Sequence, residues 1–268
     1  MQLSEIIDPN LLSREYFVQS TITADLVKIP FSDFPSISIQ GLIGKNNYIY
    51  VKVEHLEHYQ NTKKNIINFE NWSPNPFENT NIFLLSKSGQ FEIRTRTSGA
   101  SVIIGHNFKG SAEIRLLHTN PFLLIGDDVT AHSIRFQVHG NGIYIGRRSL
   151  FSEEVIVQGH DAHSIIDLNT NEILNFGDKV TKVGSYVWVG RRVTIMPGAD
   201  IGKGGVIGAT ATVTKSIPEF CLAVGVPARI IKENISWCRT KDSFDDKSKN
   251  IISQLKDQTP ENINFKVK

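Results

Sequence analysis

The chain has 268 residues, 40% of them hydrophobic, and a formal net charge of +2 at pH 7. This length suits one substantial domain with appendages, and so small a net charge indicates neither a nucleic-acid nor a membrane-surface partner. The start MQLSEIIDPN has no basic head followed by an apolar run, and no stretch approaches the ~18 apolar residues of a membrane span. We therefore expect no signal peptide, no membrane insertion and a cytoplasmic location. Cys221 and Cys238 fit neither a C-x-x-C motif nor a zinc site, so we expect free thiols.

Residues 1–81 are predicted to form a β-rich N-terminal unit that ends in a linker. Short β-prone pieces are interrupted there by proline and glycine. These pieces are Thr21–Ile29, Ser36–Ile43 and Tyr48–Val53. The segment Asn71–Asn81 contains two prolines and several asparagines, which makes it the linker candidate. Trp72 in this segment has two interpretations, a sugar-binding ring or a packing residue.

From residue 82 the sequence changes to short apolar steps separated by glycine and polar corners, and its register tightens between Val183 and Val213. There an aliphatic residue recurs at every sixth position, and a smaller residue follows each one four positions later. A helix would repeat near 3.6 residues and a long strand near two, so this period fits neither. The recurring residues are Val183, Val189, Ile195, Ile201, Ile207 and Val213.

The six-residue period fits a chain that turns a corner every six residues, so that three sides close one triangular coil of about eighteen residues. Stacked coils form parallel strands, and the repeated aliphatic side chains point inward onto their counterparts one coil away. One coil cannot fold alone, because ordering about eighteen backbones costs more than burying its aliphatic side chains gains. We therefore predict an all-β solenoid, a parallel β-helix of hexapeptide repeats, over residues 82–232.

Two segments are predicted to leave this frame. Between Val157 and Val183 a longer excursion, near residues 158–182, lies on a rigid stack of coils, which is where functional sites tend to be built. Residues 233–268 form a tail that is predicted to be partly helical, around Lys247–Lys256. We expect this tail to cap the open end of the solenoid and to cover its edge groups.

Two stretches resemble a known superfamily. The run VWVGRRVTIMPGADIGKGGVIGATATVTKSIPEFCLAVGVPARIIKE, from Val187 to Glu233, resembles the C-terminal half of hexapeptide-repeat acyltransferases. The segment DAHSIID, from Asp161 to Asp167, resembles the D-x-H-S-I-x-D signature of the polysaccharide O-acetyltransferases in that superfamily. The resemblance implies a left-handed parallel β-helix. It also implies an enzyme that uses no metal and moves acetyl from acetyl-CoA to a hydroxyl of a bacterial surface saccharide, capsular or lipopolysaccharide.

His163 matches the catalytic histidine of the family and is our candidate general base. An imidazole with a pKa near 6.5 can accept a proton from a sugar hydroxyl at neutral pH. Asp161 or Asp167 is expected to accept the ring N–H and so to fix its tautomer. Two alternatives stay open, which are His160 as the base and a purely structural role for His163.

The resemblance also assigns the acyl-donor site. Trp188 stands at the tryptophan of the family pattern V-W-I-G, and a flat indole can wall the pantetheine arm of the coenzyme. The segment GATATVTK, residues 208–215, resembles the family's G-A-G-S-V-V-T-K, with Thr210 in place of a glycine. Basic residues here would hold the adenosine phosphates, or else form a solvated corner. The expected donor-binding residues are Trp188, Ala209, Ala211, Thr214, Lys215, Arg229 and Lys232.

Members of the superfamily are usually trimers with active sites between two subunits, which the flat sides of a triangular prism allow. The resemblance therefore implies a homotrimer. The pairs Arg147–Arg148 and Arg191–Arg192 stand at predicted corners, where they either meet an anionic acceptor or are solvated. Two alternative functions remain, an N-acetyltransferase acting on an amino-sugar nucleotide and a non-catalytic carbohydrate-binding solenoid.

Overall fold

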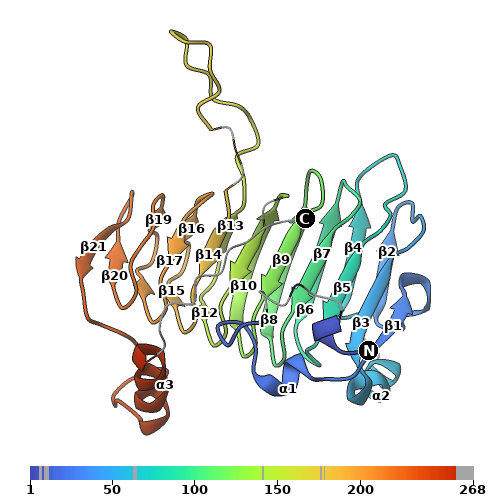
Figure 1. Cartoon of the computed structure of the whole chain (residues 1–268), viewed down its shortest axis with the longest axis horizontal. Coiled ribbons are helices and arrows are strands. Elements are labelled where there is room, and N and C mark those ends of the chain that lie inside the picture. Colours follow the sequence, from blue (N-terminus) through green and yellow to red (C-terminus); the bar gives the residue numbers. More distant parts are fainter. Residues whose placement is uncertain are drawn as a thin grey trace.

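The computed structural model describes residues 1–5, 8, 12–62, 65–140, 142–175, 177 and 179–257. The chain winds into a stack of coils whose strands run across the long axis (Figure 1). Among the described residues, eight strands form one sheet, and all its neighbours are parallel except β1 and β3. In sheet order these strands are β1 (Leu26–Pro30), β3 (Tyr48–Lys52), β5 (Asn81–Leu84), β7 (Ser101–Ile104), β9 (Phe122–Ile125), β11 (Ile143–Ile145), β14 (Thr181–Val183) and β17 (Asp200–Ile201).

A second, larger sheet supplies the other two sides of each coil. Each of its long strands β8 and β10 forms both of these sides, whereas in later coils two short strands form one side each. Its strands are β2 (Ile37–Gln40), β4 (Ile67–Asn71), β6 (Gln90–Thr95), β8 (Lys109–Leu116), β10 (Thr130–Val138), β12 (Leu150–Phe151), β13 (Val155–Gln158), β15 (Trp188–Val189), β16 (Thr194–Ile195), β18 (Val206–Ile207), β19 (Thr212–Val213), β20 (Leu222–Val224) and β21 (Arg229–Lys232).

The interior of the coils confirms the predicted repeat. The six aliphatic residues of the period are at most 1% exposed. Val183 pairs with Ile201, Val189 with Ile207, and Ile195 with Val213. Each side chain of the series therefore stacks on the residue three repeats later, as expected for a triangular coil. The residues of the series are Val183, Val189, Ile195, Ile201, Ile207 and Val213.

The solenoid starts earlier than we predicted. Strands β2 and β4 already pair in parallel, with Ile37 opposite Ile67, and β3 pairs in parallel with β5. The expected boundary at 81/82 is therefore wrong, and the expected linker is part of a coil, in which Phe77 is 1% exposed. The short helix α2 (Leu56–Asn61) lies between β3 and β4. Insertions of this kind lengthen the first coils, which is why the sequence shows no six-residue frame there.

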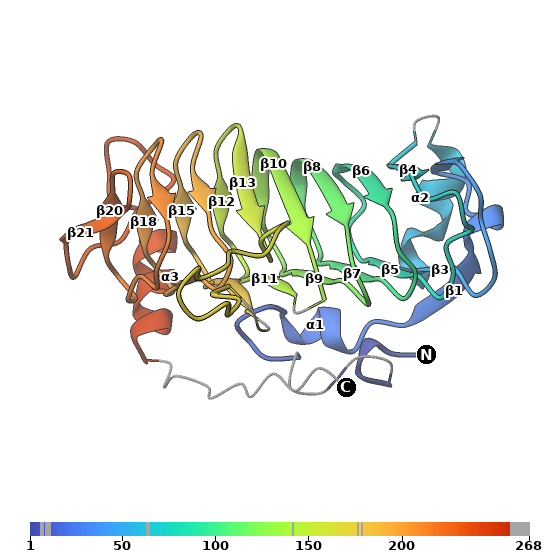
Figure 2. The same cartoon turned by 90° about the horizontal axis from the view of Figure 1, so that it is seen from above.

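Residues 12–18 lie along the outer face of the eight-stranded sheet, and the short helix α1 (Gln19–Ile22) comes next in the chain (Figure 2). Tyr16 and Phe17 are buried against apolar side chains that point outward from this sheet, among them Tyr144. The buried carboxylate of Asp127 accepts hydrogen bonds from the N–H groups of Val18 and His106, both at 2.7 Å. The segment therefore covers a face that would otherwise expose a row of aromatic and aliphatic side chains.

The tail contains the helix α3 (Asp246–Asp257), which confirms the predicted helical character; residues 258–268 lie outside the described residues. Ile251 and Leu255 pack against Phe220 and Trp237, on the outer face of the coils. In the described part of the chain, no helix has both the length and the apolar character required to cross a bilayer.

Candidate active site

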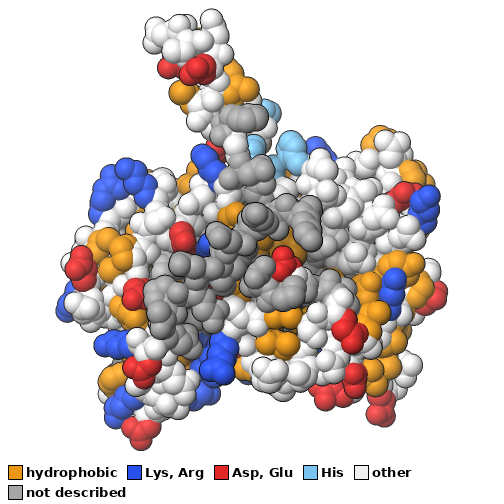
Figure 3. All heavy atoms as spheres, in the orientation of Figure 1, with side chains coloured by type: hydrophobic (Ala, Val, Ile, Leu, Met, Phe, Trp, Pro, Cys, Tyr) orange, Lys and Arg blue, Asp and Glu red, His pale blue; other side chains and the backbone are white. Residues whose placement is uncertain are grey.

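The excursion between β13 and β14 forms a projecting loop. It rises well clear of the coils (Figure 1), and histidine side chains gather at its foot (Figure 3). Its outer part is a small hairpin, in which Ile166 bridges Ile173 and the N–H of Leu174 donates to the carbonyl of Ile165 at 2.8 Å. The carboxylate of Asp167 accepts from the N–H of Asn169 at 2.7 Å, which holds the turn at the tip. Local hydrogen bonds therefore give the loop a defined shape.

His163 lies in the ascending arm of this loop with its side chain exposed. The side-chain amide of Asn175 ties this arm to the descending one. Its Nδ2 donates to the carbonyl oxygen of His163 at 2.9 Å and to Oδ2 of Asp161 at 3.1 Å. Its Oδ1 accepts from the N–H of Ile165 at 2.9 Å. One side chain therefore holds the backbone at His163 and Ile165 and the carboxylate of Asp161.

The expected orienting contact to the histidine ring is not formed. Neither Asp161 nor Asp167 accepts a hydrogen bond from the ring of His163 within the described residues. Asp167 is used by the turn, and Asp161 reaches His163 only through Asn175, which binds the backbone carbonyl. Asp161 thus lies where it can position the segment rather than the imidazole.

His160 occupies a different environment from His163. Its ring stacks on that of His139, with centroids 5.1 Å apart and planes 15° apart, and His139 stacks in turn on His118 at 4.7 Å. Burial, with smaller contributions from His118 and His160, lowers the pKa of His139 to about 4. The Nδ1 of His160 also contacts the carbonyl oxygen of Asp161. These contacts fix the ring of His160 at the foot of the loop and favour His163 as the base.

Several donor-binding candidates share the edge of the solenoid from which the loop departs. Val157 pairs with Ile195, and Ile195 with Val213, so the root of the loop and Thr214 lie two strand spacings apart, about 10 Å. Thr214 and Lys215 are exposed on this edge. Ala209 is exposed at the corner after β18. The short face formed by β13, β16 and β19 separates it from the edge that carries Thr214.

Arg229 and Lys232 lie on β21, which folds back antiparallel onto β20 at the C-terminal end of the stack. Both side chains are exposed, as phosphate-binding cations must be.

Ala211 requires a correction. It is 0% exposed, its N–H donates to the carbonyl of Gly208, and its carbonyl accepts from the N–H of Thr194. Ala211 belongs to the inward series of the repeat, so it packs the core and cannot face a coenzyme.

Trp188 is 41% exposed on β15, where it meets the C-terminal segment. Its ring lies 6.2 Å from that of Trp237, which stacks at 4.6 Å on Tyr186 and donates its indole N–H to the carbonyl of Tyr186 at 2.7 Å. In Figure 1, α3 lies below the coils whereas the loop rises above them. No hydrogen bond or ring contact joins Trp188 to His163 in the described part of the chain. One chain therefore does not bring the two together.

Sequence reasoning missed Asn175 and Trp237, because neither belongs to the motifs that resemble the family. It left the role of Trp72 open. The guanidinium carbons of Arg94, Arg96 and Arg115 lie 5.1, 5.4 and 5.8 Å from this ring, so the indole is engaged in cation–π contacts within the protein. This supports the packing interpretation. The described residues contain no group of three or more His, Cys, Asp or Glu that could hold a metal ion.

Comparisons with known proteins point to one group of enzymes, although no protein-family model matches the chain. The chain is 43% identical over 98 residues to a polysialic acid O-acetyltransferase of Escherichia coli O1:K1 / APEC, across 37% of this chain and 32% of the relative. That match therefore spans about a third of the relative's length. It is 30% identical over 152 residues to a putative lipopolysaccharide biosynthesis O-acetyl transferase, WbbJ, of Escherichia coli strain K12, across 54% of this chain and 77% of the relative.

Among solved structures, the crystal structure of the polySia specific acetyltransferase NeuO superposes with a TM-score of 0.60 and 25% sequence identity. The superposition covers 82% of this chain and 99% of that chain. The shared part is therefore most of the solenoid, including coils that precede the run from Val187 to Glu233.

Proposed function

Because the chain belongs to the hexapeptide-repeat acyltransferase family, we propose that it transfers an acetyl group from acetyl-CoA to a hydroxyl of a bacterial surface saccharide. The observation that carries the proposal is the exposed His163 on a shaped loop, on the same edge of the solenoid as Thr214 and Lys215. The names of the relatives support a saccharide acceptor. A cytoplasmic location is part of the same proposal.

In the proposed reaction, the imidazole of His163 removes the proton from the sugar hydroxyl while the hydroxyl oxygen attacks the thioester carbonyl. The carbon–oxygen bond forms, the carbon–sulfur bond breaks, and the proton passes from the imidazolium to the thiolate of coenzyme A. Backbone N–H groups or the indole N–H of Trp188 stabilise the oxyanion of the tetrahedral intermediate. Asp161 and Asn175 act as positioning residues, because they hold the backbone of His163.

The donor is proposed to lie along the C-terminal coils. Ala209 is small and exposed, so a pantetheine arm can approach the backbone at its corner. Thr214, Lys215, Arg229 and Lys232 are exposed and suited to bind the phosphates of the coenzyme.

The complete site is proposed to form between copies of the chain, in a homotrimer. The loop exposes a group of large apolar side chains, which is unusual for a surface that faces only water. Their exposed fractions run from 44% to 88%, for Ile165, Ile166, Leu168, Ile173 and Leu174. A neighbouring copy that covered these side chains would bring its own Trp188 toward His163, which one chain keeps apart.

The proposal is tested by incubating the protein with acetyl-CoA and a panel of purified surface polysaccharides, with amino-sugar nucleotides as a separate arm. We expect one or more polysaccharides to gain the mass of acetyl groups that mild base removes, as an ester requires. Acetylation of the amino-sugar nucleotide alone would replace the proposal by N-acetyl transfer. Binding of acetyl-CoA without acetylation of any acceptor would instead favour a non-catalytic solenoid.

The shared site has its own test. Two inactive variants, His163→Ala and Trp188→Ala, are mixed under conditions that exchange subunits. Mixed assemblies should regain activity, because some interfaces then combine an intact His163 with an intact Trp188. Mixtures that exchange subunits but stay inactive would contradict a site formed between copies.

A further inference from the structure

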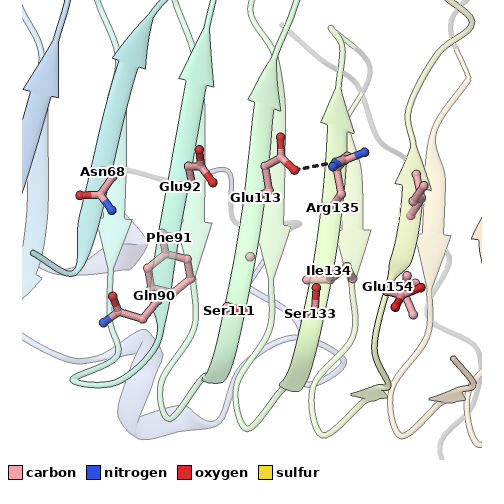
Figure 4. Close-up of a pocket in the computed structure, with 13 residues that line it drawn as sticks. Asn68, Gln90, Phe91, Glu92, Ser111, Glu113, Ser133, Ile134, Arg135 and Glu154 are labelled. Atoms are coloured by element: carbon pink, nitrogen blue, oxygen red, sulfur yellow. Dashed lines mark hydrogen bonds and ion pairs between the residues drawn. The ribbon is translucent and has the colours of Figure 1, made fainter. Parts of the chain in front are cut away.

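A groove of about 460 Å³ crosses the outer face of the large sheet, over strands that precede the projecting loop in the chain. It runs over β4, β6, β8, β10 and β13, at right angles to the strands (Figure 4). Two rows of polar side chains border it. One row consists of Asn68, Glu92, Glu113 and Arg135, and the other of Gln90, Ser111, Ser133 and Glu154.

The backbone register makes the groove long and regular. Asn68 pairs with Glu92, Glu92 with Glu113, and Glu113 with Arg135, so each coil adds one polar side chain to the row. Adjacent strands lie about 4.8 Å apart, so four strand spacings give a length of about 19 Å. Between the rows lies a floor to which the buried residues Phe91 and Ala112 contribute. Such a shape suits a segment of a linear polymer rather than a compact small molecule.

Ion pairs compensate the carboxylates that face the groove. Glu113 accepts hydrogen bonds from Arg135 at 2.6 Å, Arg115 at 2.7 Å and Arg94 at 2.9 Å. Glu92 contacts Arg94 as well.

At the far end of the groove, Glu154 pairs with Arg192 at 2.6 Å. Because each acid of the groove is matched by a guanidinium, a polyanion would gain little net attraction here.

The same pairing prepares these groups to bind hydroxyls. Burial alone would raise the pKa of Glu113, but hydrogen bonds from Arg135 and Arg115 bring it below its ordinary value, so this carboxylate stays ionised. A carboxylate has about four acceptor positions, and the amides of Asn68 and Gln90 both donate and accept. Side chains already held in place lose less entropy when a ligand binds. Alternating donors and acceptors of this kind match the hydroxyl groups of a sugar chain.

The groove also leads toward the proposed site of reaction. Its last strand, β13, contributes Ile156 to the lining, and this strand ends at Gln158, where the projecting loop begins. A polymer in the groove would therefore reach the strand from which the loop that carries His163 departs.

We propose that this groove is a second saccharide-binding site, which holds a neutral, hydroxyl-rich segment of the acceptor polysaccharide away from the point of acetylation. The inference rests on the proposed function for the identity of the acceptor. A neutral segment is a different ligand from the anionic acceptor that the corner pair Arg191–Arg192 could have held. Arg192 is already paired with Glu154.

The test measures binding of the full chain, without acetyl-CoA, to an array of bacterial surface oligosaccharides that includes neutral hexose polymers and a sialic acid polymer. Ser111→Trp fills the groove without changing its charge, and Ser133→Trp does so from the neighbouring strand if the first variant does not fold. Gln40→Trp, at an exposed neutral position on β2 of the same sheet and outside the groove lining, is the matched control. We expect wild type and Gln40→Trp to bind a neutral glycan, and the groove-filling variant to bind it at least tenfold more weakly.

Equal binding by wild type and the groove-filling variant, or binding of the sialic acid polymer alone, would overturn the inference. Thiol release from acetyl-CoA is followed separately. Glycan binding that depends on the groove, with no transfer to any acceptor, would refute the proposed function and leave the groove standing. Acetyl transfer that is as fast in the groove-filling variants as in wild type would support the proposed function and refute the groove as a binding site.

Discussion

Replacing Asn175 with alanine should slow acetyl transfer without unfolding the protein. The change removes three hydrogen bonds, of 2.9, 2.9 and 3.1 Å, that hold Asp161, His163 and Ile165. At about 1 kcal/mol each, these bonds contribute about 3 kcal/mol to the ordered loop, less what water returns at this partly exposed position. Since about 1.4 kcal/mol corresponds to a tenfold change in rate, we expect kcat/KM to fall by about 10- to 100-fold.

The assay follows thiol release from acetyl-CoA in the presence of the acceptor, and thermal unfolding is measured alongside. Asn169→Ala is the matched control, because the exposed Asn169 uses its backbone N–H, which alanine keeps, to bind Asp167. We expect the control to keep its activity and both variants to keep their melting temperature. A fully active Asn175→Ala would refute the idea that this amide sets the geometry of His163.

Three further predictions concern stability, measured by denaturant unfolding. Trp237→Ala should lower the free energy of unfolding by about 3–5 kcal/mol and make the side chain of Trp188 more mobile, because it removes the ring stack on Tyr186 and the indole hydrogen bond to its carbonyl. An unchanged unfolding midpoint would contradict this. Thr210→Gly should stabilise the fold by about 1 kcal/mol, because this β-branched residue has φ +61°, and a loss of stability would contradict it. Stability should fall as pH drops from about 6.5 toward 4, because His139 and His55, both with a pKa lowered to about 4 by burial, are protonated in the unfolded chain first, and His139→Gln should remove part of that slope.

The sequence predicted the fold best where the repeat is most regular. The inward positions from Val183 to Val213 are fixed by close packing between coils, so only aliphatic residues recur there and the period is visible. The left-handed parallel β-helix and the helical end of the tail are confirmed. The N-terminal coils escaped notice because inserts such as α2 shift the register, although their strands pair in parallel in the same way.

The proposed site residues came from family motifs, and they stay predictions. His163, Trp188 and Lys215 stand in such motifs, and all three are exposed as ligand-contacting residues must be. The role of Asn175 and the groove near Glu113 depend on contacts between residues far apart in the sequence, which no local pattern records. Ala211 was misassigned because a small residue in this repeat fits both a coenzyme contact and a core position, and only burial decides between them.

The most direct test of the account compares His163→Ala with His160→Ala in thiol release from acetyl-CoA. The acceptor is a polysaccharide that the wild-type protein acetylates in the panel. A general base typically contributes about 10²- to 10⁴-fold to the rate, so His163→Ala should lose activity by that factor. His160→Ala should stay within a few-fold of wild type, because its ring is held in the stack with His139. Near wild-type turnover by His163→Ala would contradict the central claim.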